Sequence, residues 1–273
     1  MKRGKKVLIG IGIVLLILII GGVYFMGNSW GMGPLGFLKE NRMKALAGNQ
    51  EEYHLENVEP LKDSPMKGMN LCFLGSSVTA GDASLGVAFP DYIAKRNDCT
   101  YVKEAVGGTT LVDDKDNSYI SRMKKNINPD DKFDAFIFQL STNDASQDKP
   151  LGSVSDSTNL EDFDTGTVVG AIEYIICYAQ QTWDCPVIIY TGTKYDSYKY
   201  ENYEKMVAIL PEIQEKWGIG VIDLWNNEEM DAVSEEDYEL YMADGVHPTQ
   251  AGYLEWWTPA MEEYLYEYLK PQE

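Results

Sequence analysis

From Met66 onward, short apolar runs alternate with longer segments of helical periodicity. The apolar runs cover residues 70–74, 101–105, 134–140, 186–191 and 219–224. The helical patterns between them cover residues 89–97, 120–127, 167–181 and 200–217, and a last helix is expected from Thr258 to Leu269 because Pro259 suits a first helical turn. Strands that alternate with helices form βαβ units, whose strands are parallel and whose crossovers are right-handed. The pattern therefore predicts an α/β domain built on a parallel sheet.

The first 26 residues have a different character. Lys2, Arg3, Lys5 and Lys6 precede a stretch, residues 7–26, that carries no charged side chain. Twenty helical residues at about 1.5 Å each span roughly 30 Å, which is the thickness of a bilayer's hydrocarbon core. Basic residues tend to stay on the cytoplasmic side. We therefore expect a cytoplasmic tail (1–6), a transmembrane anchor (7–26) and a catalytic domain outside the membrane.

A cleaved signal peptide would begin in the same way. The residues after the apolar stretch, 27–31, offer no A-x-A cleavage site, so an uncleaved anchor is expected and a secreted product is the alternative. Residues 27–65 are first glycine-rich and then polar, with one short helix predicted over 37–47, and read as a juxtamembrane stalk. The domain is then expected over 66–271.

Charge and cysteine content exclude some functions. The net charge of −20 argues against nucleic acid as a partner, because phosphate binding requires clustered Lys and Arg. Four cysteines are too few for a disulfide scaffold and lack the close pairing of a zinc site. Cys72 and Cys177 lie in apolar segments and are expected as buried thiols, whereas a bridge from Cys99 or Cys185 is left open.

Two hydroxyl residues follow the first apolar run. Ser76 and Ser77 stand on a predicted turn flanked by Gly75 and Gly81, where a ligand can approach the backbone closely. Open α/β sheets bind ligands at the carboxyl ends of their strands, which is where this turn is expected. Taken alone, the same residues could simply cap the next helix.

Three further segments place polar groups after strands or in the last loop. Gly107-Gly108 can offer a backbone N–H, and the Asn143 amide can donate to an oxyanion. His247 is the only histidine in the predicted domain, and Asp244, three residues earlier, can hold its ring. A metal-binding role for His247 has little support, because the predicted domain has no second histidine. Each segment alone is an ordinary turn, but together they indicate a shared crevice.

The order Gly-Ser-Ser-Val-Thr, Gly-Gly-Thr-Thr, Ser-Thr-Asn-Asp and Asp-Gly-Val-His-Pro resembles the SGNH hydrolase (GDSL-like esterase/lipase) superfamily over residues 66–269. The resemblance implies a flavodoxin-like three-layer αβα sandwich with a five-stranded parallel sheet and no metal or organic cofactor. It also implies Ser77 as nucleophile, His247 as base, Asp244 as its orienting partner, and an oxyanion hole of Ser77, Gly108 and Asn143. Ser76 replaces the family's usual Asp and stays an alternative nucleophile, while Ser141 replaces a usual Gly.

These features predict a membrane-anchored, extracytoplasmic serine esterase that removes an O-acyl group, expected to be acetyl, from a glycan. An acyltransferase using the same site, or a non-catalytic glycan-binding module, is the alternative. Aromatic residues that could face a sugar are Tyr195, Tyr198, Tyr200, Tyr203, Trp256 and Trp257. The polar connection over 145–166 could line the site or be a surface insertion. The sequence leaves the oligomeric state open.

Overall fold

A computed structural model describes residues 2–194 and 200–270, and the chain divides into the units Met1–Ala47 and Gly48–Glu273. The first unit contains helix α1 (Lys2–Trp30) and helix α2 (Phe37–Lys44), which is three residues shorter than the predicted 37–47. Within α1, the stretch Ile11–Ser29 has a mean hydropathy of 2.3 and is long and apolar enough to cross a membrane by length and composition. An apolar helix is therefore present at the N-terminus, where the anchor is predicted.

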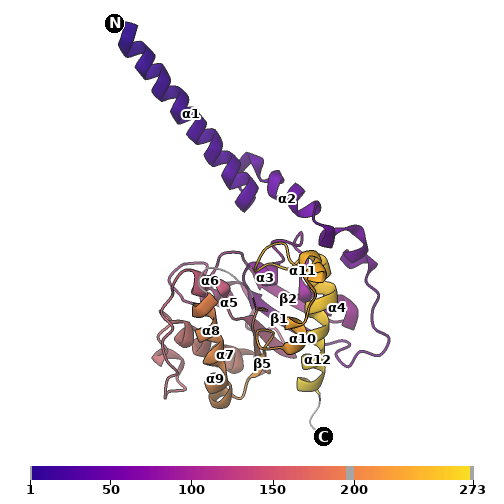
Figure 1. Ribbon diagram of the computed structural model, residues 1–273. Coiled ribbons are helices and arrows are strands. Elements are labelled where there is room, and N and C mark those ends of the chain that lie inside the picture. The colour runs from indigo at the N-terminus through magenta and orange to yellow at the C-terminus, as the bar shows by residue number, and fades with distance from the viewer. Residues whose placement is uncertain (1, 195–199, 271–273) are drawn as a thin grey trace. The chain divides into compact units, whose positions relative to one another are not determined.

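The second unit is built on a five-stranded parallel sheet (Figure 1). Its strands are β1 (Asn70–Gly75), β2 (Thr100–Ala105), β3 (Ala135–Gln139), β4 (Val187–Tyr190) and β5 (Gly220–Ile222). The spatial order is β2-β1-β3-β4-β5, and every neighbouring pair is parallel. This is the flavodoxin-like order. The chain places β2 on one side of β1, and then adds β3, β4 and β5 in turn on the other side. The predicted fold is confirmed.

Helices cover both faces of the sheet (Figure 1). Along β1, Leu71 and Phe73 enter one core and Cys72 and Leu74 enter the other, because successive strand residues point to opposite faces. The first core packs against α4 (Phe89–Asn97) and α12 (Thr258–Tyr268). The second packs against α5 (Tyr119–Asn126), α7 (Val168–Trp183), α8 (Tyr200–Ala208) and α9 (Leu210–Trp217).

The predicted helix over 200–217 is two helices. Helix α8 ends at Ala208 and α9 begins at Leu210, with Pro211 in its first turn. Proline has no backbone N–H to donate to the preceding turn, so the helix breaks there. Some helical segments of the structure are too short to show a helical period in the sequence, and they were not predicted. They are α3 (Ser77–Ala80), α6 (Thr142–Ser146), α10 (Glu228–Asp231), α11 (Glu235–Tyr241) and the π-helical segment Gly252–Trp257.

Residues of the predicted stalk fall on both sides of the division between the two units. In the second unit, the buried Asn49 side chain donates to the Ala83 carbonyl at 2.8 Å, and the Tyr92 hydroxyl donates to the Tyr53 carbonyl at 2.7 Å. Val58 and Met66 are buried in the same core. Residues 48–65 are therefore packed together with the sheet domain.

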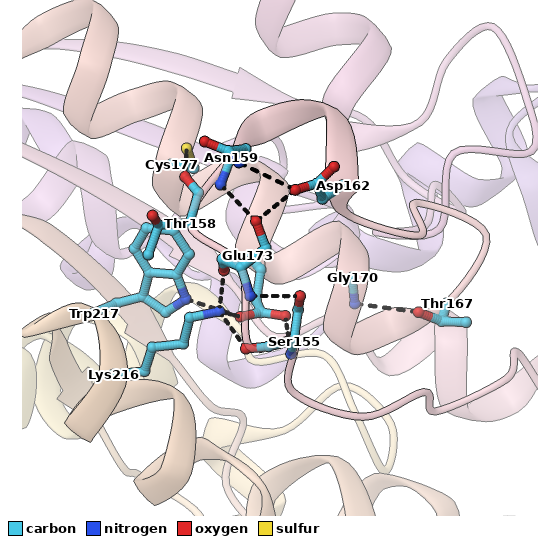
Figure 2. Close-up of polar contacts among 11 residues, drawn as sticks. Ser155, Thr158, Asn159, Asp162, Thr167, Gly170, Glu173, Cys177, Lys216 and Trp217 are labelled. Carbon is cyan, nitrogen blue, oxygen red and sulfur yellow. Dashed lines mark hydrogen bonds and ion pairs between the residues drawn. The ribbon is translucent and has the colours of Figure 1, made fainter.

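The long connection between α6 and α7 is anchored at its centre (Figure 2). Lys216 Nζ, on α9, donates to the carbonyls of Ser155 and Ser157, both at 2.6 Å, and lies 2.5 Å from Glu173 Oε1 on α7. The fully buried Glu173 also accepts from Trp217 Nε1 at 3.1 Å and from the Ser155 N–H at 2.9 Å. A buried ion pair therefore ties this segment to two helices.

All four cysteines are free thiols, so the bridge left open for Cys99 or Cys185 does not form. Burial raises the pKa of both of these thiols to about 11.

Candidate active site

The turn after β1 is fixed by a buried amide. Ser76 donates to Gln139 Oε1 with its backbone N–H at 2.9 Å and with its hydroxyl at 3.2 Å, and the Thr79 hydroxyl donates to the same oxygen at 2.9 Å. A Cβ on Gly75 would lie 1.7 Å from Thr79 Oγ1, so only glycine fits at the end of this strand. The Ser76 hydroxyl is therefore engaged by Gln139 and fully buried, whereas the next residue, Ser77, begins α3 at the strand's carboxyl end.

Ser77, His247 and Asp244 form one hydrogen-bonded chain. Ser77 Oγ lies 2.8 Å from His247 Nε2, although the two residues are 170 positions apart in the sequence. His247 Nδ1 lies 2.9 and 3.0 Å from the two Asp244 carboxylate oxygens. A proton on Nδ1 donated to Asp244 leaves Nε2 free to accept the Ser77 hydroxyl proton. The structure thus brings these three predicted residues together.

The Asp244 carboxylate also accepts two backbone N–H groups, from Val246 at 2.8 Å and from His247 at 2.9 Å. Burial raises the pKa of Asp244, but the His247 ring and these two amides lower it more strongly, to about 2. The carboxylate is therefore ionised throughout the neutral range. The loop itself is closed by the Ala243 N–H, which donates to the His247 carbonyl at 2.9 Å, and by a bridge between Met242 and Pro248.

Asn143 lies against the loop that contains Gly108. Its side-chain Nδ2 donates to the Thr109 carbonyl at 2.9 Å, and the Ser141 hydroxyl accepts its backbone N–H at 3.2 Å while capping α6. An amide nitrogen carries two hydrogens, so one remains for another acceptor. Gly108 has a φ of +77°, which favours glycine at this turn.

A second contact places the glycine turn beside α3, the helix that begins at Ser77. A Cβ on Gly107 would lie 2.2 Å from Asp82 Oδ2, and the Asp82 N–H donates to the Ser77 carbonyl at 3.0 Å. The two glycines, Asn143 and Ser77 therefore come from neighbouring segments at one edge of the sheet.

Two buried side chains that the sequence patterns did not single out support these loops. The Asp144 carboxylate accepts the N–H groups of Leu111 at 2.8 Å and Val112 at 3.1 Å, and burial raises its pKa above the usual value despite these bonds. Arg122 Nη2 donates to the Gly75 carbonyl at 2.8 Å and to Thr109 Oγ1 at 3.1 Å. Asp144 stands next to Asn143 in its motif, but nothing in the sequence signals Arg122 beyond its place on an amphipathic helix.

Within residues 2–194 and 200–270, no three His, Cys, Asp or Glu side chains gather as metal ligands would. The groups that the site presents are the Ser77 hydroxyl, the His247 imidazole, the Asp244 carboxylate and the Asn143 amide.

Comparisons with known proteins identify the family. The model of the GDSL-like lipase/acylhydrolase family matches residues 73–254, which include all five predicted site residues. No curated protein matches the chain. A solved protein from Lactobacillus plantarum has 21% identity over 74% of this chain and 97% of its own, with a TM-score of 0.58.

Two further solved structures share the fold. A possible lipase from Chitinophaga pinensis has 14% identity over 73% of this chain and 98% of its own, with a TM-score of 0.55. An acetyl xylan esterase has 15% identity over 72% and 98%, with a TM-score of 0.51. Because the family model covers most of the chain, the protein belongs to the GDSL-like lipase/acylhydrolase family of the SGNH superfamily and is a hydrolase of ester bonds.

Proposed function

We propose that the protein is a serine esterase in which Ser77 Oγ attacks the ester carbonyl. As the C–O bond forms, His247 Nε2 takes the hydroxyl proton, and the ionised Asp244 stabilises the imidazolium. The imidazolium then protonates the leaving alkoxide, giving an acyl-enzyme and a free alcohol. Water, deprotonated by the same imidazole, attacks the acyl-enzyme and releases the carboxylic acid.

The oxyanion formed at each step needs donors that are already in place. We assign this role to the backbone N–H groups of Ser77 and Gly108 and to the side-chain amide of Asn143. The hydrogen bond from Asn143 to the Thr109 carbonyl holds the amide beside the glycine loop and supports this assignment. Preorganised donors of this kind lower an acyl-transfer barrier by about 3–4 kcal/mol each.

The observation that carries the proposal is the unbroken chain from Ser77 through His247 to Asp244. A module that only binds a glycan needs neither a base nor a carboxylate to orient it. The test is p-nitrophenyl acetate hydrolysis by the full-length protein in detergent, compared with its Ser77→Ala and Ser76→Ala variants.

Ser77→Ala should lose turnover by roughly 10⁴-fold or more, since removing one member of such a unit removes the effect of the whole. Ser76→Ala is the matched control and should keep most of the turnover, because that hydroxyl donates to Gln139 and is fully buried. The reverse pattern would move the nucleophile to Ser76.

For the substrate we propose an O-acetyl ester on a glycan. The shared fold with an acetyl xylan esterase and the expected position outside the cytoplasm support this class. Acetate release from acetylated oligosaccharides, compared with lysophospholipid and short-chain esters, tests it. A preference for the lipid would overturn it.

We also propose that α1 is an uncleaved anchor, with the N-terminus in the cytoplasm and the domain outside. Its apolar stretch and the basic residues before it support this orientation. In sealed cells, external protease should remove the domain and leave a membrane-bound fragment. A soluble protein lacking the first residues would instead indicate cleavage.

A further inference from the structure

A cavity of about 400 Å³ lies between the end of β4 and helices α10 and α11, and it has no part in the steps above. It is bounded by Thr193, which follows β4, by Met230 and Asp231 on α10, by Tyr238 and Glu239 on α11, and by Trp256. Parallel strands end at one edge of the sheet, so Thr193 and Ser77 stand at the same edge. The volume of the cavity lies within the range of about 300–1,000 Å³ that is typical of small-ligand sites.

The position of α11 brings this cavity close to the catalytic loop. The helix ends at Tyr241, three residues before Asp244. The Tyr238 carbonyl accepts the Met242 N–H at 2.9 Å, and the next residue, Ala243, donates its N–H to the His247 carbonyl at 2.9 Å. Burial, followed by the negative charge of Asp244, raises the pKa of Tyr238. A ligand held against Tyr238 would therefore be near the proposed reacting groups.

The aromatic wall of the cavity is made of rings that pack on one another. The Trp256 indole stacks on Tyr241 at 5.9 Å between ring centroids and meets Tyr238 edge-to-face at 6.3 Å. Its Nε1 is buried and has no hydrogen-bond partner within the described residues. Of the other aromatic candidates, Trp257 and Tyr203 are buried in the two cores, Tyr200 packs against Trp225, and Tyr195 and Tyr198 lie outside the described residues. Trp256 is therefore the one of the six, within the described part, that lines this cavity.

The rim of the cavity is acidic. Glu235 and Glu239 are exposed on it, and its lysine, Lys194, is already paired with Asp231. Carboxylates accept hydrogen bonds from hydroxyl and ammonium groups and repel other anions. The chain's net charge of −20 adds to this repulsion.

We infer that this cavity is a sugar subsite, which holds an uncharged or amino-bearing ring of the esterified glycan and disfavours acidic sugars. The C–H face of the ring would pack on the aromatic wall, and its hydroxyl or ammonium groups would bond to the rim carboxylates. This inference rests on the proposed esterase function, because it places the subsite beside the same nucleophile.

The test compares three substrates on the full-length protein: p-nitrophenyl acetate, acetylated xylo-oligosaccharides and acetylated oligogalacturonides, which are acidic. Wild type should show a kcat/KM at least tenfold higher on the xylo-oligosaccharides than on the oligogalacturonides. Trp256→Ala should raise KM for the xylo-oligosaccharides. The fold-change in this KM should be at least ten times the fold-change in p-nitrophenyl acetate turnover. Tyr174→Ala, which removes a half-buried tyrosine on α7, is the matched control and should shift neither.

Glu239→Lys is the second variant, because Glu239 is exposed and its replacement leaves the core intact. It should narrow the preference for the neutral substrate at least fivefold. Three results would overturn the subsite: wild type that hydrolyses p-nitrophenyl acetate without a glycan preference, a Trp256→Ala variant whose KM for the xylo-oligosaccharides is unchanged, or a Glu239→Lys variant whose preference is unchanged. Absence of all ester turnover in folded wild type would instead overturn the esterase proposal itself.

Discussion

Replacing Lys216 by Met removes the cation that faces a fully buried carboxylate. In the native protein, Lys216 Nζ donates to Glu173 and to the carbonyls of Ser155 and Ser157, and its side chain is only 17% exposed. The variant would leave the Glu173 charge buried with two weaker donors, the Trp217 indole and the Ser155 amide. Breaking one side of a buried ion pair costs about 3–5 kcal/mol. We expect that loss in the free energy of unfolding.

Urea denaturation followed by tryptophan fluorescence measures this loss, and limited proteolysis of the segment between α6 and α7 measures its local consequence. The matched control is Lys270→Met, whose pair with Glu267 is exposed and should contribute less than about 1 kcal/mol. The double variant Lys216→Met/Glu173→Gln removes both charges and should lose less stability than Lys216→Met alone. A loss below 1 kcal/mol for Lys216→Met, with no new cleavage in the segment, would refute the anchoring role of this ion pair.

The remaining predictions concern the site. Asn143→Ala should lower kcat by about 10²–10³-fold while the thermal midpoint falls little, since it removes one proposed oxyanion donor and one hydrogen bond; steady-state kinetics and a melting curve check both. Gln139→Leu should lower the free energy of unfolding, measured by urea denaturation, by about 2–5 kcal/mol, and should also lower kcat. The reason is that the Ser76 N–H and the Thr79 hydroxyl lose their acceptor. An unfolding free energy equal to that of wild type would contradict this. Asp244→Asn should show a stability deficit against wild type that is constant above about pH 5 and shrinks as the pH falls from 4 toward 2. The reason is that a lowered carboxyl pKa stabilises the folded state only while the group is ionised; the deficit should be about 1 kcal/mol or less, because the side chain is 57% exposed.

The fold was predictable because its strands carry a strong signal. Strands buried on both faces read as continuous apolar runs, and residues 70–74 and 135–139 are of this kind. The meeting of Ser77 with His247 followed from topology, since a turn after a parallel strand and a late loop share one edge of the sheet.

The groups that hold this edge together were not predictable. Gln139, Arg122 and Asp144 bind backbone or hydroxyl groups of loops that are distant in the sequence, and such partners leave no periodic trace. The limits of the second unit were also hidden, because residues 48–65 look polar although Asn49 and Val58 are buried. Ser76, which stands where the resemblance implies an Asp, donates its N–H and its hydroxyl to Gln139, and only the structure reveals this partner.

The proposed nucleophile is Ser77 and not its neighbour Ser76. Treating the full-length protein with a fluorophosphonate, followed by digestion and peptide mapping, identifies the reactive hydroxyl. One phosphonyl group is expected on Ser77, with labelling slowed strongly by His247→Ala and unaffected by Ser76→Ala. Labelling on Ser76, or no labelling of folded protein, would contradict it.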